Sequence, residues 1–147
     1  MKLKLSFFIV LVIVLCSCGT NNKSLEEVQG QDTGIQELNI VINKYFKNFD
    51  DINKWSEFAT EDFVKRAYSW CSGDISGTKT IEEMKSVYFD INKDTLDLIG
   101  YKIEEVDKES ESNVIIFVTR EWEDGQTDQT SYSILKTNEG WKFDNRF

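Results

Sequence analysis

The side chain with the clearest chemical potential in this sequence is Arg120. It lies at an alternate position of one expected strand, in line with four apolar residues, Val114, Ile116, Val118 and Trp122. Arg120 therefore continues an apolar face instead of opposing it. A guanidinium in that position can bind the acidic group of a small ligand. The alternative is a structural arginine, whose stem lies along the core while its head reaches water or a neighbouring glutamate.

Four aromatic residues are candidates for the wall of a pocket around this guanidinium: Tyr101, Trp122, Tyr132 and Trp55. Large rings bury much apolar surface, and they form plain core as readily as they line a ligand site. The residue types alone leave both interpretations open.

Other chemistries have less support. The chain has no histidine, which excludes Ser-His and Cys-His nucleophile pairs and His-ligated zinc or haem. Acidic doublets such as Glu61-Asp62 diverge on a helix or a strand, so a doublet is not a catalytic pair. The segment from Asp90 to Asp94 has the spacing of a calcium loop, but Thr95 and Tyr101 replace its required glycine and glutamate. We therefore expect neither a metal nor a cofactor.

Length and charge set the class of protein. The chain has 147 residues, 40% of them apolar, with 17 basic and 26 acidic side chains and a net charge of −9. This length suits one folded domain, and the apolar content is too high for a disordered chain. The acidic balance argues against nucleic-acid binding, which needs a basic surface.

The first residues describe an export signal. Lys2 and Lys4 precede an apolar run, Leu5 to Leu15. Eleven helical residues cover about 16 Å, roughly half of the ~30 Å hydrocarbon core of a bilayer. A basic start and a short apolar run of this kind indicate a secretory signal peptide and not a membrane-spanning helix.

The end of that run, Leu15-Cys16-Ser17-Cys18-Gly19, resembles the lipobox of bacterial lipoproteins. The resemblance implies that residues 1–17 are removed and that Cys18 carries the lipid (palmitate among its acyl chains), with Leu15 at −3 and Ser17 at −1. Cys16 fits less well, because Leu15 would then lie next to the cut. The protein would be extracytoplasmic and anchored to a membrane of the cell envelope. The alternative is a signal peptide that is cut elsewhere.

Residues 18–34 are expected to form a lipidated, flexible tether, because Gly19 to Asp32 is polar apart from Leu25 and Val28. Cys16 leaves with the signal and Cys18 carries lipid, so Cys71 is the one remaining thiol and cannot form an internal disulfide. Its apolar surroundings favour a buried, unreactive side chain.

Apolar residues recur at steps of three and four in the first part of the domain, which indicates amphipathic helices. Such a helix is expected from Ile35 to Phe49, with Thr33 to Gln36 in the spacing of a capping box. Asp50-Asp51 closes it or opens a short helix. Thr60 and Thr80 are N-cap residues of further helices, the latter in a capping box with Glu83. We expect about three helices in this region.

From about residue 96 the apolar period shortens to two, which indicates strands. Ile99, Tyr101 and Ile103 alternate with polar residues, and the apolar segment 114–118 predicts a central strand. Asp124-Gly125 and the turn at 138–140 predict hairpins. Helices followed by about four antiparallel strands make an α+β fold.

Residues 35–147 resemble the nuclear transport factor 2-like (cystatin-like) superfamily. The segments that carry the resemblance are 45–49 (YFKNF), 58–64 (FATEDFV) and 140–143 (GWKF). It implies a cone of helices over a curved antiparallel sheet. The superfamily includes enzymes and carriers, so it implies a shape more than an activity. It also implies a homodimer through the sheet face.

These patterns together predict a non-catalytic, membrane-anchored lipoprotein. It would bind a small ligand in the cone or dock to another envelope protein, and it would not bind nucleic acid. The alternative function is a small isomerase- or dehydratase-like enzyme with a carboxylate and a tyrosine in the cone.

Overall fold

Helices come first along the chain and long strands follow. The structure, a computed structural model, describes residues 26–27 and 30–147. The helices are α1 (Gln36–Lys47), α2 (Ile52–Trp55), α3 (Glu61–Ser72) and α4 (Ile81–Asn92), with a 3₁₀ turn η1 (Ser56–Phe58) after α2. The strands are β1 (Glu26–Glu27), β2 (Leu98–Lys108), β3 (Asn113–Trp122), β4 (Thr127–Thr137) and β5 (Gly140–Arg146).

The α+β class is confirmed, and the expected count of about three helices is corrected to four in the described part of the chain. The difference arises after Lys47, where α1 ends at its C-cap Asn48. Asp51 then begins a new helix, because its carboxylate accepts a hydrogen bond from the backbone N–H of Asn53 at 3.0 Å.

Two of the three expected helix starts are confirmed. The hydroxyl of Thr60 accepts the N–H of Phe63 at 3.1 Å, and Thr80 and Glu83 form the full capping box. The third expectation was wrong. Thr33 lies outside α1, and its hydroxyl donates to Oδ1 of Asn39 at 2.7 Å instead of capping the first turn.

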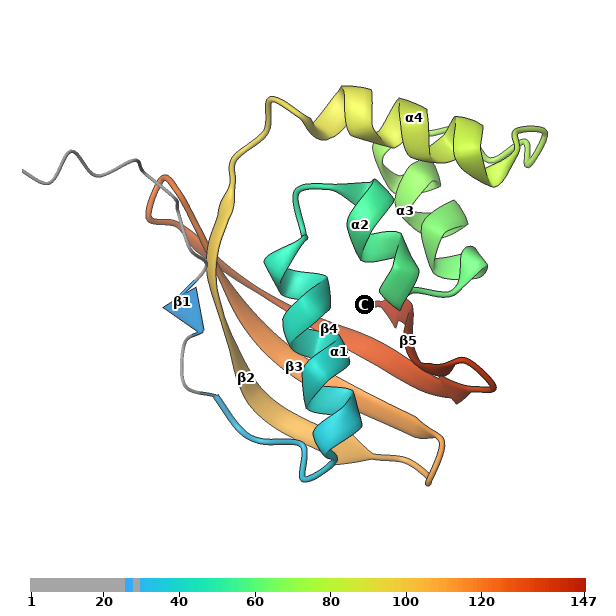
Figure 1. The fold of residues 1–147 in the computed structure, drawn as a ribbon. Helices are drawn as coiled ribbons and strands as arrows, with labels where there is room; N and C mark the ends of the chain where they lie inside the picture. The colour runs from blue at the N-terminus through green and yellow to red at the C-terminus, as the bar shows by residue number, and fades with distance from the viewer. Residues whose placement is uncertain (1–25, 28–29) are drawn as a thin grey trace, which may run out of the picture.

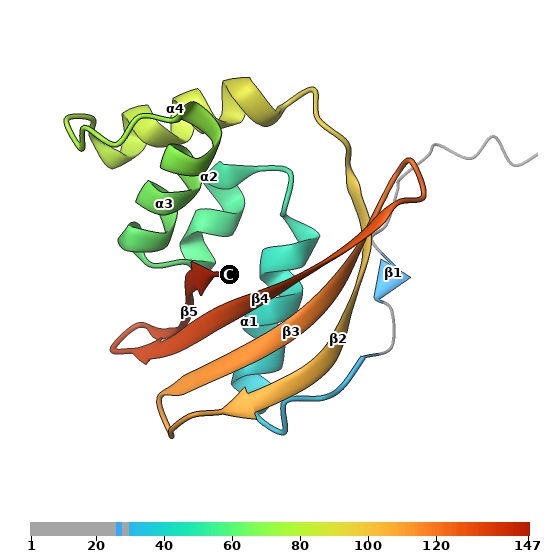
Figure 2. The same cartoon turned by 180° about the vertical axis from the view of Figure 1, so that it is seen from behind.

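The strands form one sheet in the order β1-β2-β3-β4-β5, with β2 to β5 antiparallel. Both expected hairpins are present, and Gly125 lies in the left-handed region at φ +79°. Figures 1 and 2 show the sheet bending around α1, which lies on its inner face, while α2, α3 and α4 gather at one end. The inner face and the helices enclose the core.

The core is aromatic at its centre. Tyr45 and Phe143 stack with ring centroids 3.9 Å apart, and Phe46 stacks on Tyr101 at 4.3 Å. β3 is central in the sheet, as expected, with its inner residues wholly buried. Its outer face is open in the described part of the chain, where the side chain of Phe117 is 41% exposed.

Three register shifts interrupt the pairing of the strands, two in β2 and one in β5. In β2 they lie between Leu98 and Gly100 and between Ile103 and Glu105, and at the first of them Leu98 is buried while Ile99 is only half-buried. In β5 one extra residue, Asp144, lies between the partners of Ile134 and Ser133. The bulge in β5 brings a charged residue to the inner face, as described below.

The chain joins the sheet before residue 35. β1 pairs in parallel with β2, and the N–H of Gln31 donates to the carbonyl of Ile103 at 2.8 Å. Gly30 lies so close to the backbone of Ile103 that a Cβ has no space there. The end of the expected tether is therefore held against the edge of β2.

The expected signal peptide and Cys18 lie outside the described residues. Within residues 26–27 and 30–147, no helix has the length and apolar character needed to cross a membrane.

Candidate functional site

A cleft of about 360 Å³ opens where the end of α4 faces the sheet. We call it the outer cleft, and its lining includes Phe49, Tyr88, Asn92, Arg120, Trp122 and Arg146. Helix α4 contributes Tyr88 and Asn92, and β3 contributes Arg120 and Trp122. The cleft therefore lies at the open end of the layer between helices and sheet.

Arg120 is bound within the protein. Its Nε and Nη2 donate to the two carboxylate oxygens of Asp128 at 2.7 and 2.6 Å, and its Nη1 donates to the hydroxyl of Tyr132 at 3.2 Å. The guanidinium also lies 5.0 Å from the ring of Trp122 and 5.6 Å from that of Phe49. Burial acts to lower the pKa of Arg120, but the hydrogen bonds and charge of Asp128 outweigh burial and raise it.

The structure thus gives Arg120 a partner of the kind that the structural interpretation requires, although the acid is Asp128 and not a glutamate. A bidentate pair uses the fork of the guanidinium, which is the part that would bind a ligand carboxylate. Arg120 forms a wall of the outer cleft, with its charge matched by Asp128.

We expect Arg120→Ala and Asp128→Ala each to lower the free energy of unfolding by about 2–3 kcal/mol. Removing Asp128 leaves a guanidinium that is only 8% exposed without its countercharge, and removing Arg120 leaves the buried hydroxyl of Tyr132 unpaired. The loss should be smaller than for a fully buried pair, because the side chain of Asp128 is 43% exposed and water screens its charge. Urea denaturation of the single and double variants measures the coupling.

The matched control is Lys102→Ala, which breaks an exposed pair with Glu104 and should cost less than about 1 kcal/mol. The double variant should lose less stability than the sum of the two single losses, and the difference should be about 1 kcal/mol or more. Simple additivity would show that Arg120 and Asp128 do not stabilise the fold as a pair.

The other four residues expected in the pocket lie in different parts of the structure. Trp122 joins Arg120 in the outer cleft, and Tyr132 is wholly buried beneath it. Trp55 lies deeper, where its ring packs on Tyr45, Phe63 and Tyr88. The ring of Tyr101 is buried on Phe46, and it lines a different, small pocket near Gly30. The five residues therefore do not form one pocket.

A second cavity, of about 180 Å³, lies beside the outer cleft and is lined mainly by residues of the helices. We call it the inner chamber. Its aromatic lining consists of Tyr45, Phe49, Trp55, Phe63, Trp70 and Tyr88. Phe49, Tyr88, Asn92 and Arg146 line both spaces, so the chamber and the cleft are neighbours.

Two tyrosine hydroxyls in the inner chamber have no hydrogen-bond partner among residues 30–147. Tyr45 is only 3% exposed, and Tyr88 is half-buried. Burial raises the pKa of both, and the neighbouring Tyr132 raises that of Tyr45 further, while Arg146 and Arg120 act in the opposite direction. Both hydroxyls are therefore protonated at neutral pH and can donate to a bound molecule.

The charged residue of the inner chamber is Arg146. Its guanidinium carbon lies 4.6 Å from the centre of the Trp70 ring, and it forms no ion pair with any of residues 30–147. The bulge at Asp144 sets its direction, because it places Arg146 opposite the inward-facing Tyr132. The hydroxyl of Thr60 donates to Asp144 at 2.9 Å and connects this bulge to the start of α3.

Sequence reasoning missed Arg146, Tyr45 and Tyr88 as site residues. Tyr45 and Tyr88 follow the helical period of ordinary core residues, so their free hydroxyls leave no mark in the pattern. Strict alternation from the buried Phe143 would place residue 145 on the inner face. The bulge shifts the alternation by one residue, so Arg146 lies on that face instead.

Cys71 lies at the edge of the inner chamber. It is half-buried, its thiol donates to the carbonyl of Tyr68 at 3.3 Å, and burial raises its pKa. The expected fully buried position is thus only partly realised, while a raised pKa agrees with an unreactive thiol. No carboxylate lines the chamber in the described part of the chain.

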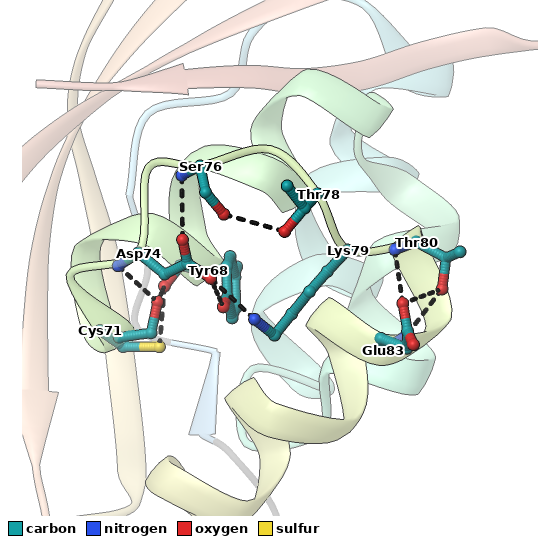
Figure 3. A network of polar contacts seen from close by, with 9 residues as sticks. Tyr68, Cys71, Asp74, Ser76, Thr78, Lys79, Thr80 and Glu83 are labelled. Atoms are coloured by element: carbon teal, nitrogen blue, oxygen red, sulfur yellow. Dashed lines mark hydrogen bonds and ion pairs between the residues drawn. The ribbon is translucent and has the colours of Figure 1, made fainter.

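A polar network holds the two helices that form this side of the chamber (Figure 3). Between α3 and α4, the carboxylate of Asp74 accepts hydrogen bonds from Lys79 at 2.8 Å, Tyr68 at 2.6 Å and the N–H of Ser76 at 2.9 Å. These contacts, that of Lys79 first, hold the pKa of Asp74 far below its usual range. The loop therefore fixes α4 against α3.

No protein-family model matches this sequence, and no curated protein matches it at a significant level.

Proposed function

We propose that this chain is an exported lipoprotein, anchored to a membrane of the bacterial cell envelope through Cys18, that binds a small ligand between its helices and its sheet without catalysis. The lipobox-like segment at residues 15–19 supports the anchor. The observation that carries the binding function is Tyr45, a residue that is 3% exposed, lines an aromatic cavity and has no hydrogen-bond partner for its hydroxyl among residues 26–27 and 30–147.

Among the described residues, the one fully enclosed side-chain polar atom without a partner is Nε1 of Trp141, so the unpaired hydroxyl of Tyr45 reaches the open space of the chamber and is available to water or a ligand. A ligand oxygen in the inner chamber would complete the hydrogen bonding of Tyr45 and Tyr88 at once. The exposed Trp70 in its lining shows that the chamber opens to solvent, so a ligand can enter it. The chamber has the concave, apolar character of small-molecule sites, with a few convergent polar groups.

We further propose that the domain has the nuclear transport factor 2-like cone. Four helices that precede a bent antiparallel sheet support this proposal, as do the three sequence segments named above. The enzymatic alternative requires a carboxylate beside a tyrosine within the cone. The lining of the inner chamber supports binding instead, because its described residues include tyrosines and no carboxylate.

Docking to an envelope protein, or to a second copy of the chain, is the second candidate function. The outer face of the sheet favours it, because Phe117 and Phe147 are 41% and 67% exposed beside a shallow groove of about 380 Å³. Such a surface would leave the inner chamber free, so the two functions are compatible.

Filling the inner chamber should abolish ligand binding. Ala67 is buried on α3 and lines the chamber, so Ala67→Leu places three additional carbon atoms in it. We expect small aromatic fragments, detected by ligand-observed NMR, to bind the unmodified protein and to lose about tenfold or more in affinity with the variant. The fluorescence of Trp55 and Trp70 should report the same binding.

The matched control is Ser69→Leu, which enlarges a half-buried side chain on the same helix outside the chamber. It should leave fragment binding unchanged. If no fragment binds the unmodified protein, or if Ala67→Leu and Ser69→Leu bind fragments equally well, the chamber is not the ligand site.

A further inference from the structure

We propose that the ligand of the inner chamber is a single-ring aromatic carboxylate, with its ring among the aromatic side chains and its carboxylate at Arg146. This inference rests on the proposed function and names the class of ligand for the same site. It follows from the volume of the chamber, the unmatched charge at its mouth and the kind of hydrogen-bonding groups that it contains.

The volume of the inner chamber suits one ring. A cavity of about 150 Å³ in a protein core holds one benzene molecule. The chamber measures about 180 Å³, and its walls are the rings of Trp55, Phe63 and Trp70 together with the tyrosines. These flat walls favour a flat ligand, because offset and edge-to-face ring contacts each contribute about 0.5–1.5 kcal/mol.

The charge at the junction of chamber and cleft is unmatched. Among the cations that line the outer cleft, Arg120 pairs with Asp128, Lys54 with Asp51 and Lys93 with Asp90. Arg146 has no such acid among residues 30–147, although the chain carries an excess of acidic residues. A ligand anion would supply the missing countercharge.

The N–H groups of the Arg146 guanidinium are available to a ligand. The guanidinium carbon lies over the ring of Trp70 at 4.6 Å. The side-chain N–H groups form no hydrogen bond with residues 26–27 and 30–147, so the guanidinium can bind a carboxylate through two parallel hydrogen bonds. Trp70 remains 45% exposed, so this side of the chamber is open to solvent.

The remaining polar groups also favour an anion. The hydroxyls of Tyr45 and Tyr88 can donate, and their raised pKa keeps them protonated. The side-chain amide of Asn92 donates to the carbonyl of Tyr88 at 2.8 Å. With donors available and no carboxylate in the described lining, the chamber fits an acceptor group such as a carboxylate better than a cation.

The test uses detergent-solubilised full-length protein and three probes, benzoate, benzamide and acetate, in isothermal titration calorimetry. Benzamide keeps the ring and the shape of benzoate without its charge, and acetate keeps the charge without the ring. We expect benzoate to bind about 10–100-fold more tightly than either control compound, because only benzoate uses both the ring walls and Arg146.

Arg146→Gln should lower the affinity for benzoate by about 10–100-fold while changing that for benzamide by less than about threefold. Arg66→Gln is the matched control, because Arg66 is half-buried on α3 and lines neither space, and it should leave both affinities unchanged. If Arg146→Gln does not fold, Arg146→Lys keeps the charge without the fork and should lose about fivefold for benzoate.

The outcomes separate the ligand class from the site. Equal binding of benzamide and benzoate, or benzoate binding that is insensitive to Arg146→Gln, would overturn the carboxylate assignment. Binding of other fragments that Ala67→Leu abolishes, without any binding of benzoate, would overturn the ligand class and leave the proposed function intact. Absence of all fragment binding would overturn both.

Discussion

Replacing Cys18 with Ala is expected to move nearly all of the protein from the membrane fraction to the soluble fraction. Each buried CH₂ group of an acyl chain contributes about 0.8 kcal/mol to membrane binding, and several chains make that binding stable. The chain has a net charge of −9, so an anionic bilayer repels it overall, and we expect electrostatic attraction not to replace the lipid. Fractionation of cells, followed by immunoblotting, measures the distribution.

Cys16→Ala is the matched control, because Cys16 lies in the same segment and is expected to leave with the signal peptide. It should keep the protein in the membrane fraction. Metabolic labelling with an alkyne-bearing fatty acid should mark the unmodified protein and the Cys16 variant but not the Cys18 variant. Label or membrane retention in Cys18→Ala would contradict acylation at this residue.

Phe143→Ala should lower the free energy of unfolding by about 3–5 kcal/mol, a large part of the 5–15 kcal/mol that stabilises a typical domain. Phe143 is wholly buried on β5. Its ring stacks on Tyr45 at 3.9 Å and meets the edge of Tyr132 at 5.3 Å. The loss therefore combines the transfer of a large ring with a cavity at the junction of α1 and the sheet. Urea denaturation followed by circular dichroism measures it.

Phe117→Ala removes the same side chain from the outer face of β3, where it is 41% exposed. It should cost less than about 1 kcal/mol. Similar losses in the two variants would mean that the inner face of the sheet is not the core of this domain.

Local chemistry determines much of this fold, and the sequence alone was sufficient there. The side chains of Thr60 and Thr80 cap helices within three residues of their own positions, so their roles can be read without the rest of the chain. The alternation in β3 likewise places Arg120 on the inner face, because successive side chains of a strand point to opposite sides. The hairpin at Asp124-Gly125 is local as well.

The local sequence pattern could not assign a role to a residue when neighbouring residues were compatible with two interpretations. Thr33 has the spacing of a capping box, yet its hydroxyl donates to Asn39 six residues away. Arg120 was compatible with a ligand clamp and with a structural pair, and the pattern could not show that Asp128 of the neighbouring strand binds its guanidinium. The alternation along a strand shows on which face of the sheet a side chain lies, but it does not show which residue of the neighbouring strand binds it.

The sequence by itself determined the α+β class, most helix starts, the strand period and the segment that resembles a lipobox. Only the tertiary structure decided where a ligand could bind. Arg146 faces the inner chamber because a bulge at Asp144 adds one residue to β5, and the Tyr45 hydroxyl is left unpaired within residues 26–27 and 30–147 because none of their polar groups reaches it. Both features depend on contacts between residues far apart in the chain, whereas periodicity and capping record only interactions within a few residues.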